Sequence, residues 1–210
     1  ILKAKKPLFV LGAGAIPQAE NIKMLADMYQ IPVATTYNAR GIIPEDDSIN
    51  LGLVGIRATP RAKKAINESD CVIALGSIAS ERTFPVLDED KFIHVNINKD
   101  VLKGKYQIQG DVEEVIMTLE FNKVDWIDEL LKIDNTIVVD GIDDDLKPQA
   151  AIKRILDHFD GNIIAVDAGS HTTWTTLLYN AKSPNHFLFP AATAPMGYGL
   201  PAGNGRRDFP

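Results

Sequence analysis

Residues 7–14 read PLFVLGAG, a short apolar run that stops at a Gly-x-Gly turn. The segment that follows is amphipathic, with apolar side chains at helical spacing at Ile22, Leu25, Ala26 and Tyr29. A strand that is apolar at every position is typical of a parallel sheet, because helices cover both faces of such a sheet. This stretch therefore predicts a strand, a tight turn and a helix of an α/β fold.

The same alternation continues along the chain. Apolar stretches predict further strands at 31–35 (IPVAT), 71–75 (CVIAL) and 91–97 (KFIHVNI). Thr59 followed by Pro60 predicts the N-cap and the first position of a helix. Asp111 begins a capping pattern for another helix, which carries Val115, Ile116 and Leu119. Residues 1–146 are therefore expected to form one doubly wound, Rossmann-like α/β domain with a parallel sheet.

A polar stretch separates this domain from a second, incomplete α/β unit at residues 147–210. A short helix is expected near Trp126 and an extended run at 136–139, before the acidic residues 140–145. The spacing of these acidic residues fits no EF-hand, so they predict a solvated linker rather than a calcium loop. After Pro148 the pattern predicts a helix ending at Gly161, a strand at 162–167, a helix at 172–179 and another strand at 187–189.

Composition limits the class of protein. The net charge of −6 gives no electrostatic support to nucleic-acid binding. Cys71 is the single cysteine and lies in an apolar run, so we expect a buried thiol, no internal disulfide and a cytoplasmic protein. No apolar run approaches the roughly 20 residues that cross a bilayer. We assign no metal ligands, and we expect His94 in the core and His158 and His186 at the surface.

The first candidate ligand site is a glycine turn. Gly12 and Gly14 follow the first strand, where backbone N–H groups at a helix N-terminus can hold a dinucleotide phosphate. However, Pro17 occupies the third glycine position of the nicotinamide fingerprint, and Thr36 lies where an acidic ribose ligand is expected. A standard NAD site is therefore not expected, and a purely structural turn explains these glycines equally well.

The second candidate turn, Ala168–His171, follows the predicted strand at 162–167. Gly169 permits close approach of the backbone, Ser170 offers a hydroxyl, and the dipole of the following helix favours an anion. His171 can donate to a phosphate oxygen or cap the helix. Met196, among glycine and proline residues, is either a core residue in a sharp turn or an apolar support beneath a ligand.

In their order along the chain, these segments resemble thiamine-diphosphate-dependent enzymes of the acetolactate synthase large-subunit type. The resemblance implies that residues 1–146 are the middle domain and residues 147–210 the truncated start of the diphosphate-binding domain. The stretches that carry it are KKPLFVLGAGA at 5–15, IPVATTYNARGIIPEDDSINLGLVGIRATPRAKKAINESDCVIALGSIASERT at 31–83, FIHVNINKDVLKGKYQIQGDVEEVI at 92–116, LKPQAAIKRILDHFDGNIIAVDAGSHTTW at 146–174 and PMGYGLPA at 195–202.

The resemblance also implies cofactors and the residues that hold them. At the thiamine diphosphate, it places Ala168, Gly169, Ser170 and His171 beside the diphosphate, and Ala194, Met196 and Gly197 beside the aminopyrimidine. The bulky residue at Met196 keeps that cofactor bent in the family. In the middle domain it implies FAD, with contacts at Gly12, Ala13, Gly14, Thr36, Gly55, Gly76, Arg82, Asn96 and Asp111. Ile78 and Ser80 replace an arginine and an aspartate of the family, so FAD, another nucleotide or an empty domain remain open.

The implied activity is decarboxylation of a 2-oxo acid such as pyruvate followed by carboligation, with thiamine diphosphate and Mg²⁺, in branched-chain amino-acid biosynthesis. The catalytic glutamate and the Mg²⁺ motif of the family have no counterpart in this sequence, whose tail at 203–210 departs from the family pattern. No catalytic residue is therefore assigned, and the chain alone is expected to be inactive. A homodimer or homotetramer is expected. Another 2-oxo acid decarboxylase, a pyruvate oxidase and a non-catalytic nucleotide-binding module remain alternatives.

Overall fold

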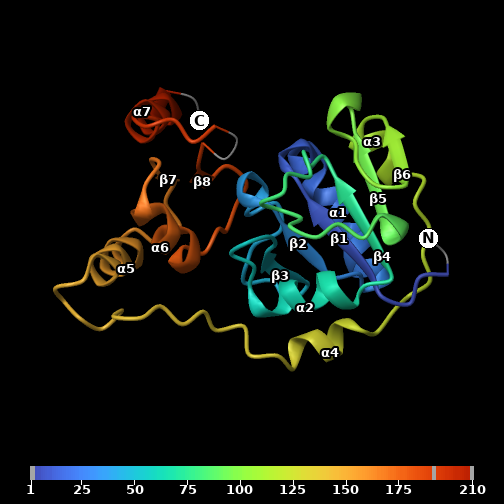
Figure 1. Cartoon of the computed structure of the whole chain (residues 1–210), viewed down its shortest axis with the longest axis horizontal. Helices are drawn as coiled ribbons and strands as arrows, with labels where there is room; N and C mark the ends of the chain where they lie inside the picture. Colours follow the sequence, from blue (N-terminus) through green and yellow to red (C-terminus); the bar gives the residue numbers. More distant parts are fainter. Residues whose placement is uncertain (1–2, 191–192, 209–210) are drawn as a thin grey trace.

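The larger sheet of the computed structural model has six strands, all parallel, in the order β3-β2-β1-β4-β5-β6 (Figure 1). The structure describes residues 3–190 and 193–208. The strand order reverses between β1 and β4, so a crevice is expected where the carboxyl ends of these two strands diverge. The predicted doubly wound parallel sheet is confirmed. Its strands are β1 Pro7–Leu11, β2 Val33–Thr35, β3 Asn50–Leu53, β4 Cys71–Leu75, β5 Phe92–Asn96 and β6 Tyr106–Gln109.

Helices cover both faces of this sheet because its strands bury side chains on both sides. They are α1 (Ala19–Tyr29), α2 (Pro60–Glu68), α3 (Val112–Ile116) and α4 (Ile127–Leu131), with the short 3-10 helices η1 (Ala13–Gln18), η2 (Tyr37–Ala39), η3 (Glu89–Lys91) and η4 (Lys99–Val101). The face that carries Phe9 and Leu11 packs against α1 and α3. The opposite face, with Leu8 and Val10, packs against α2 and against Leu130 of α4.

The two predicted capping residues behave differently. Asp111 accepts a hydrogen bond from the N–H of Glu113 at 2.9 Å, and so caps α3 as predicted. Thr59 does occupy the N-cap of α2, but its hydroxyl donates to the carbonyl of Leu51 instead of accepting from the helix. Thr59 therefore ties α2 to the edge strand β3. The run at 136–139, expected to be extended, lies outside any strand.

A second unit is built on a two-stranded parallel sheet of β7 (Ile164–Ala165) and β8 (Phe187–Leu188). Both predicted strands are present but shorter than expected. Its helices are α5 (Pro148–His158), α6 (Ser170–Leu178) and α7 (Gly199–Asp208), of which α7 lies in a glycine-rich segment where no helix was expected. Residues 209 and 210, at the end of the divergent tail, lie outside the described residues.

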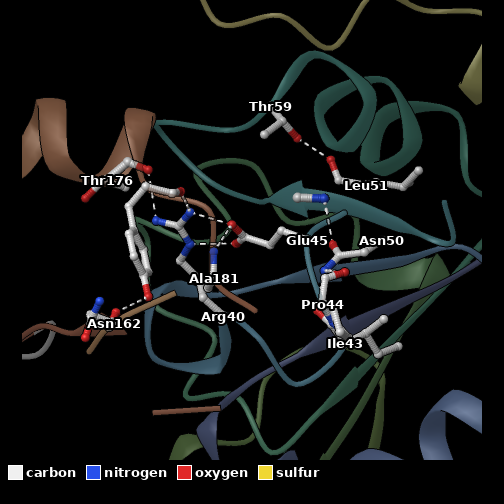
Figure 2. A network of polar contacts seen from close by, with 12 residues as sticks. Arg40, Ile43, Pro44, Glu45, Asn50, Leu51, Thr59, Asn162, Thr176 and Ala181 are labelled. Carbon is white, nitrogen blue, oxygen red and sulfur yellow. Dashed lines mark hydrogen bonds and ion pairs between the residues drawn. The ribbon is translucent and has the colours of Figure 1, made fainter. Parts of the chain in front are cut away.

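The two units share a core on the β3 side of the larger sheet (Figure 1). Tyr37 of η2 and Leu53 of β3 cluster there with apolar side chains of the second unit, namely Leu156, Val166, Tyr179, Ala181 and Phe187. Polar contacts reinforce the joint, because Glu45 accepts a hydrogen bond from the N–H of Ala181 at 2.9 Å (Figure 2). The expected domain boundary between residues 146 and 147 stays a prediction, since this packing does not test it.

Cys71 lies buried in β4 as a free thiol, as predicted, and its burial raises the pKa of the thiol. Within the described residues, no helix has both the length and the apolar character of a membrane span. The described His, Cys, Asp and Glu side chains also form no group of three that could bind a metal ion.

Candidate functional site

A cavity of about 430 Å³ opens at the carboxyl ends of β1, β2 and β4. Its walls include five of the nine residues predicted for FAD, which are Gly12, Ala13, Thr36, Gly76 and Arg82. Gly14, Gly55, Asn96 and Asp111 do not line it. The sheet thus brings most of the predicted nucleotide residues together, at the crevice that the strand order defines.

The glycines beside this cavity have a structural reason. A Cβ on Gly12 would lie 2.3 Å from the carbonyl oxygen of Gly76, and one on Gly76 would lie 2.5 Å from the carbonyl carbon of Gly14. The Gly12 N–H donates to Leu75 at 2.8 Å and the Gly14 N–H to Gly76 at 3.0 Å. These two amides therefore join the turns after β1 and β4, and the α-helix begins only at Ala19, after η1.

The loop after β4 is held from behind by polar side chains of β5. The carbonyl of Ser77 accepts hydrogen bonds from His94 Nε2 at 2.9 Å and from Asn96 Nδ2 at 2.7 Å. The Lys103 N–H donates to His94 Nδ1 at 2.9 Å, which assigns a neutral ring with its proton on Nε2. His94 is fully buried, which confirms its predicted place in the core, and this burial lowers the pKa of the imidazole. Asn96 therefore supports the loop through the Ser77 carbonyl, and Asp111 caps α3. Neither residue lines the cavity.

Charge in the cavity favours an anion. Arg57 and Arg82 both line it, together with the single carboxylate of Glu81. In the described part of the chain, no carboxylate lies within ion-pair distance of either arginine. Gly55 positions this wall, because a Cβ there would lie 2.2 Å from the carbonyl oxygen of Arg82. Guanidinium groups without acidic partners are ready to bind phosphate oxygens.

The second candidate site is the turn between β7 and α6. Gly169 is the N-cap of α6, and the helix begins without a side-chain cap and without an acidic residue in its first turn. Ser170 and His171 are exposed there. The His171 ring lies against Gly169, where a Cβ would approach it to 2.8 Å. An uncapped helix N-terminus with exposed hydroxyl and imidazole groups favours an anionic ligand.

Asp167, which the sequence analysis did not single out, joins the two predicted cofactor segments. Its carboxylate accepts from the N–H of Ala168 at 2.8 Å and from the N–H of Gly197 at 2.9 Å on each oxygen. The Tyr198 N–H is the third donor, with a longer bond of 3.3 Å to Oδ1. The N–H of Ala168, followed by those of Gly199, Gly197 and Tyr198, holds the pKa of this carboxyl below its usual range against desolvation.

The segment that Asp167 holds contains Ala194 and Met196. Ala194 has a positive φ of 46°, and its N–H donates to Pro190 at 2.9 Å. Met196 is 89% exposed, so its alternative assignment as a core methionine is wrong. An exposed thioether beside Gly197 leaves an apolar surface that a ligand can cover.

An α/β chain with an anion-favouring crevice and a bare helix N-terminus has the architecture that nucleotide- and diphosphate-binding proteins use. Comparison with known proteins is more specific. Residues 1–119 match the family described as "Thiamine pyrophosphate enzyme, central domain", and residues 167–207 match "Thiamine pyrophosphate enzyme, C-terminal TPP binding domain". The chain therefore belongs to the thiamine pyrophosphate enzyme family.

Similar curated proteins are acetolactate synthases. The chain is 29% identical to the probable acetolactate synthase large subunit of Methanocaldococcus jannaschii, over 99% of the chain and 40% of that protein. It is 31% identical to the large subunit of Porphyra purpurea, over 98% of the chain and 38% of that protein. It is 28% identical to the acetolactate synthase isozyme 1 large subunit of Escherichia coli, over 96% of the chain and 39% of that protein. The chain thus spans about two fifths of the length of these relatives.

Proposed function

We propose that the chain is part of a thiamine-diphosphate-dependent enzyme that acts on 2-oxo acids, most like acetolactate synthase. The observation that carries the proposal is Asp167, whose carboxylate binds backbone amides on both predicted cofactor segments. The names of the similar proteins support the acetolactate synthase type. In this proposal, pyruvate is decarboxylated and joined to a second 2-oxo acid by a homo-oligomer.

The residues at the turn fit the diphosphate of that cofactor. The amides of the first turn of α6 have no side-chain cap, and the Ser170 hydroxyl and His171 ring are exposed beside them. These groups would hold the diphosphate, while the exposed Met196 would lie against the aminopyrimidine. When bound, thiamine diphosphate supplies the carbon nucleophile that attacks a 2-oxo acid. Mg²⁺ is assigned no ligands, because the described carboxylates form no metal-binding group.

FAD is proposed for the 430 Å³ cavity, with Arg57 and Arg82 as the cationic groups that face its phosphates. The bonds of Gly12 and Gly14 to the neighbouring turn limit what those two amides offer a ligand. A nucleotide held mainly by arginine side chains is also what a non-catalytic binding module would contain. This second candidate function is therefore favoured if a nucleotide binds and thiamine diphosphate does not.

Calorimetric titration with thiamine diphosphate and Mg²⁺ tests the proposal on this chain and on a longer chain that spans the full length of its relatives. We expect binding that Ser170→Ala and His171→Ala weaken about tenfold each, since each removes a charge-assisted hydrogen bond. Thr136→Ala, which also removes an exposed side-chain hydroxyl, is the matched control and should leave the affinity unchanged. Product analysis of the longer chain with pyruvate separates a synthase, which forms acetolactate, from a decarboxylase or an oxidase. Absence of cofactor binding by both chains contradicts the proposal.

A further inference from the structure

Arg57 stands between the two candidate sites. Its guanidinium lines the 430 Å³ cavity, and its Nη2 donates to Thr173 Oγ1 of α6 at 2.6 Å. Thr173 is in the first turn of α6, three residues after Ser170. One side chain of the larger sheet unit therefore lines the proposed nucleotide cavity and contacts the first turn of α6, directly after the proposed diphosphate turn at 168–171.

The guanidinium retains donors for a ligand. Of the five N–H groups that it carries, one at Nη1 binds Tyr37 Oη at 3.1 Å and one at Nη2 binds Thr173. No carboxylate of the described residues lies within ion-pair distance of Arg57, which is only partly exposed. A phosphate oxygen in the cavity would therefore supply the missing counter-charge without displacing Tyr37 or Thr173.

A second wall residue links the same two units. Phe189, which follows β8, lines the cavity, and its ring packs on Tyr37 with 5.5 Å between centroids. Tyr37 is also the hydroxyl that Arg57 binds. The cavity is thus completed by the second unit, so a ligand inside it contacts both units at once.

We infer that Arg57 is a positioning residue that couples occupancy of the cavity to order in the first turn of α6. The inference rests on the proposed anionic ligand of the cavity. Such a ligand fixes the guanidinium in the orientation that binds Thr173, and this stabilises the turn where the diphosphate would be held. Because such coupling is reciprocal, a ligand at the turn would tighten binding in the cavity by the same factor.

Amide hydrogen exchange of the 210-residue chain tests the inference without requiring thiamine diphosphate. FAD is the probe, and quenching of its fluorescence reports binding independently. With FAD bound, we expect exchange at residues 170–174 to slow by about fivefold or more, the lower end of ordinary coupling. Thr173→Val should bind FAD within about twofold of the wild type but lose the slowing, because it removes the acceptor of Arg57.

Thr173→Ser keeps the hydroxyl, so FAD should slow amide exchange at residues 170–174 in this variant as it does in the wild type. If Thr173→Val acted only by disturbing the packing of α6, the hydroxyl of Thr173→Ser would not bring this effect back. Circular dichroism confirms that each variant is folded. The inference is overturned if FAD binds and exchange at 170–174 is unchanged, or if Thr173→Val keeps the slowing. If FAD does not bind, the inference fails together with the FAD assignment. The thiamine diphosphate titration, made separately, still decides the proposed enzyme.

Discussion

Arg40 and Glu45 form a bidentate ion pair inside the joint between the two units, with Nε 2.6 Å from Oε1 and Nη2 2.6 Å from Oε2 (Figure 2). The guanidinium also donates to the carbonyls of Thr176, at 2.9 Å, and Tyr179 at the end of α6. It lies 4.9 Å from the ring centroid of Phe187. The C-terminal end of α6 is thus capped by a cation from the larger sheet unit, as the helix dipole favours.

Replacement of Arg40 should be among the most damaging single changes. Arg40→Met leaves the Glu45 carboxylate, only 11% exposed, without its cationic partner, although the Ala181 N–H still donates to it. It also removes the guanidinium donor of two carbonyls at the end of α6. We expect the free energy of unfolding to fall by about 3–5 kcal/mol, as for other buried pairs that lose one partner. Urea denaturation measures this value.

Two comparisons make the Arg40 prediction specific. The double variant Arg40→Met with Glu45→Met should lose less free energy of unfolding than Arg40→Met alone, because it leaves no buried charge without a partner. Lys153→Met, in the exposed pair with Asp157, should change stability by less than about 0.5 kcal/mol. Equal losses in all three variants would contradict a buried ion pair at the joint.

Gly12→Ala should distort the turns that border the 430 Å³ cavity. The new Cβ would lie 2.3 Å from both the carbonyl oxygen of Gly76 and the Cα of Ser77, which are backbone atoms that cannot rotate away. A loss of about 1–3 kcal/mol in the free energy of unfolding is expected from this overpacking. Gly205→Ala in α7 is the matched control, since nothing in the described residues apart from its own helix backbone lies within 4 Å of its Cβ position. It should be neutral or stabilise by about 0.5–1 kcal/mol. Thermal unfolding of both variants measures the contrast.

His94 should make stability depend on pH in the mildly acidic range. Burial lowers the pKa of its imidazole, and the positive charge of Lys103 lowers it further. The hydrogen bond to the Ser77 carbonyl raises the pKa but does not offset these two effects. The unfolded chain, with an ordinary histidine pKa of about 6.5, binds the proton more readily than the folded chain. Stability from this group is therefore present above about pH 6.5 and is lost as the pH falls towards the folded pKa.

The measurement for His94 is the free energy of unfolding in urea between neutral pH and about pH 5. Gln offers a donor and an acceptor but does not titrate, so His94→Gln should be less stable at neutral pH and should flatten the pH dependence. His158→Gln, at an exposed position of α5, should retain the slope of the wild type. The same slope in all three proteins would exclude His94 as its source.

The pattern of apolar residues along the sequence predicted those strands in which every residue is buried. The bounds of β1 and β4 match the predicted runs at 7–11 and 71–75, because continuous burial requires continuous apolar sequence. β6 was missed because Tyr106–Gln109 is an exposed edge strand with alternating polar residues. β3 was missed because Asn50 and Gly52, the latter with a φ of +93°, break the apolar pattern of the sequence. In the structure, the Asn50 side chain is buried and donates to the Ile43 carbonyl at 2.7 Å (Figure 2).

The candidate site was predictable only where it lies in strand-to-helix turns. Gly12, Gly76 and the turn at 168–171 follow strands, so their place at the carboxyl edge follows from the fold class. Arg57 could not be assigned, because its partner Thr173 lies 116 residues further along the chain. Asp167 contacts Gly197 across 30 residues for the same reason. Neither contact leaves a periodic signal in the sequence.

Asp167→Asn should loosen the link between the two cofactor segments. The N–H groups of Ala168, Gly197 and Tyr198 all donate to Oδ1, and that of Gly197 also reaches Oδ2. An asparagine can keep the bonds at Oδ1, but it loses the negative charge that strengthens them and places its own N–H groups near the Gly197 N–H. We expect the affinity for thiamine diphosphate to fall by about tenfold at neutral pH, measured by calorimetry.

The pH dependence of stability distinguishes this role of Asp167 from a general loss of folding. The folded pKa of the carboxyl is depressed, chiefly by the Ala168 N–H, so its contribution is present above the unfolded value of about 3.9 and is lost as the pH falls through the folded pKa. The difference in Tm between the wild type and Asp167→Asn should therefore be largest near neutral pH and shrink below about pH 4. Asp160→Asn, in an exposed ion pair with Lys182, should leave cofactor affinity unchanged. A Tm difference that is constant down to about pH 3 would mean that the carboxylate charge at Asp167 does not hold the two segments together.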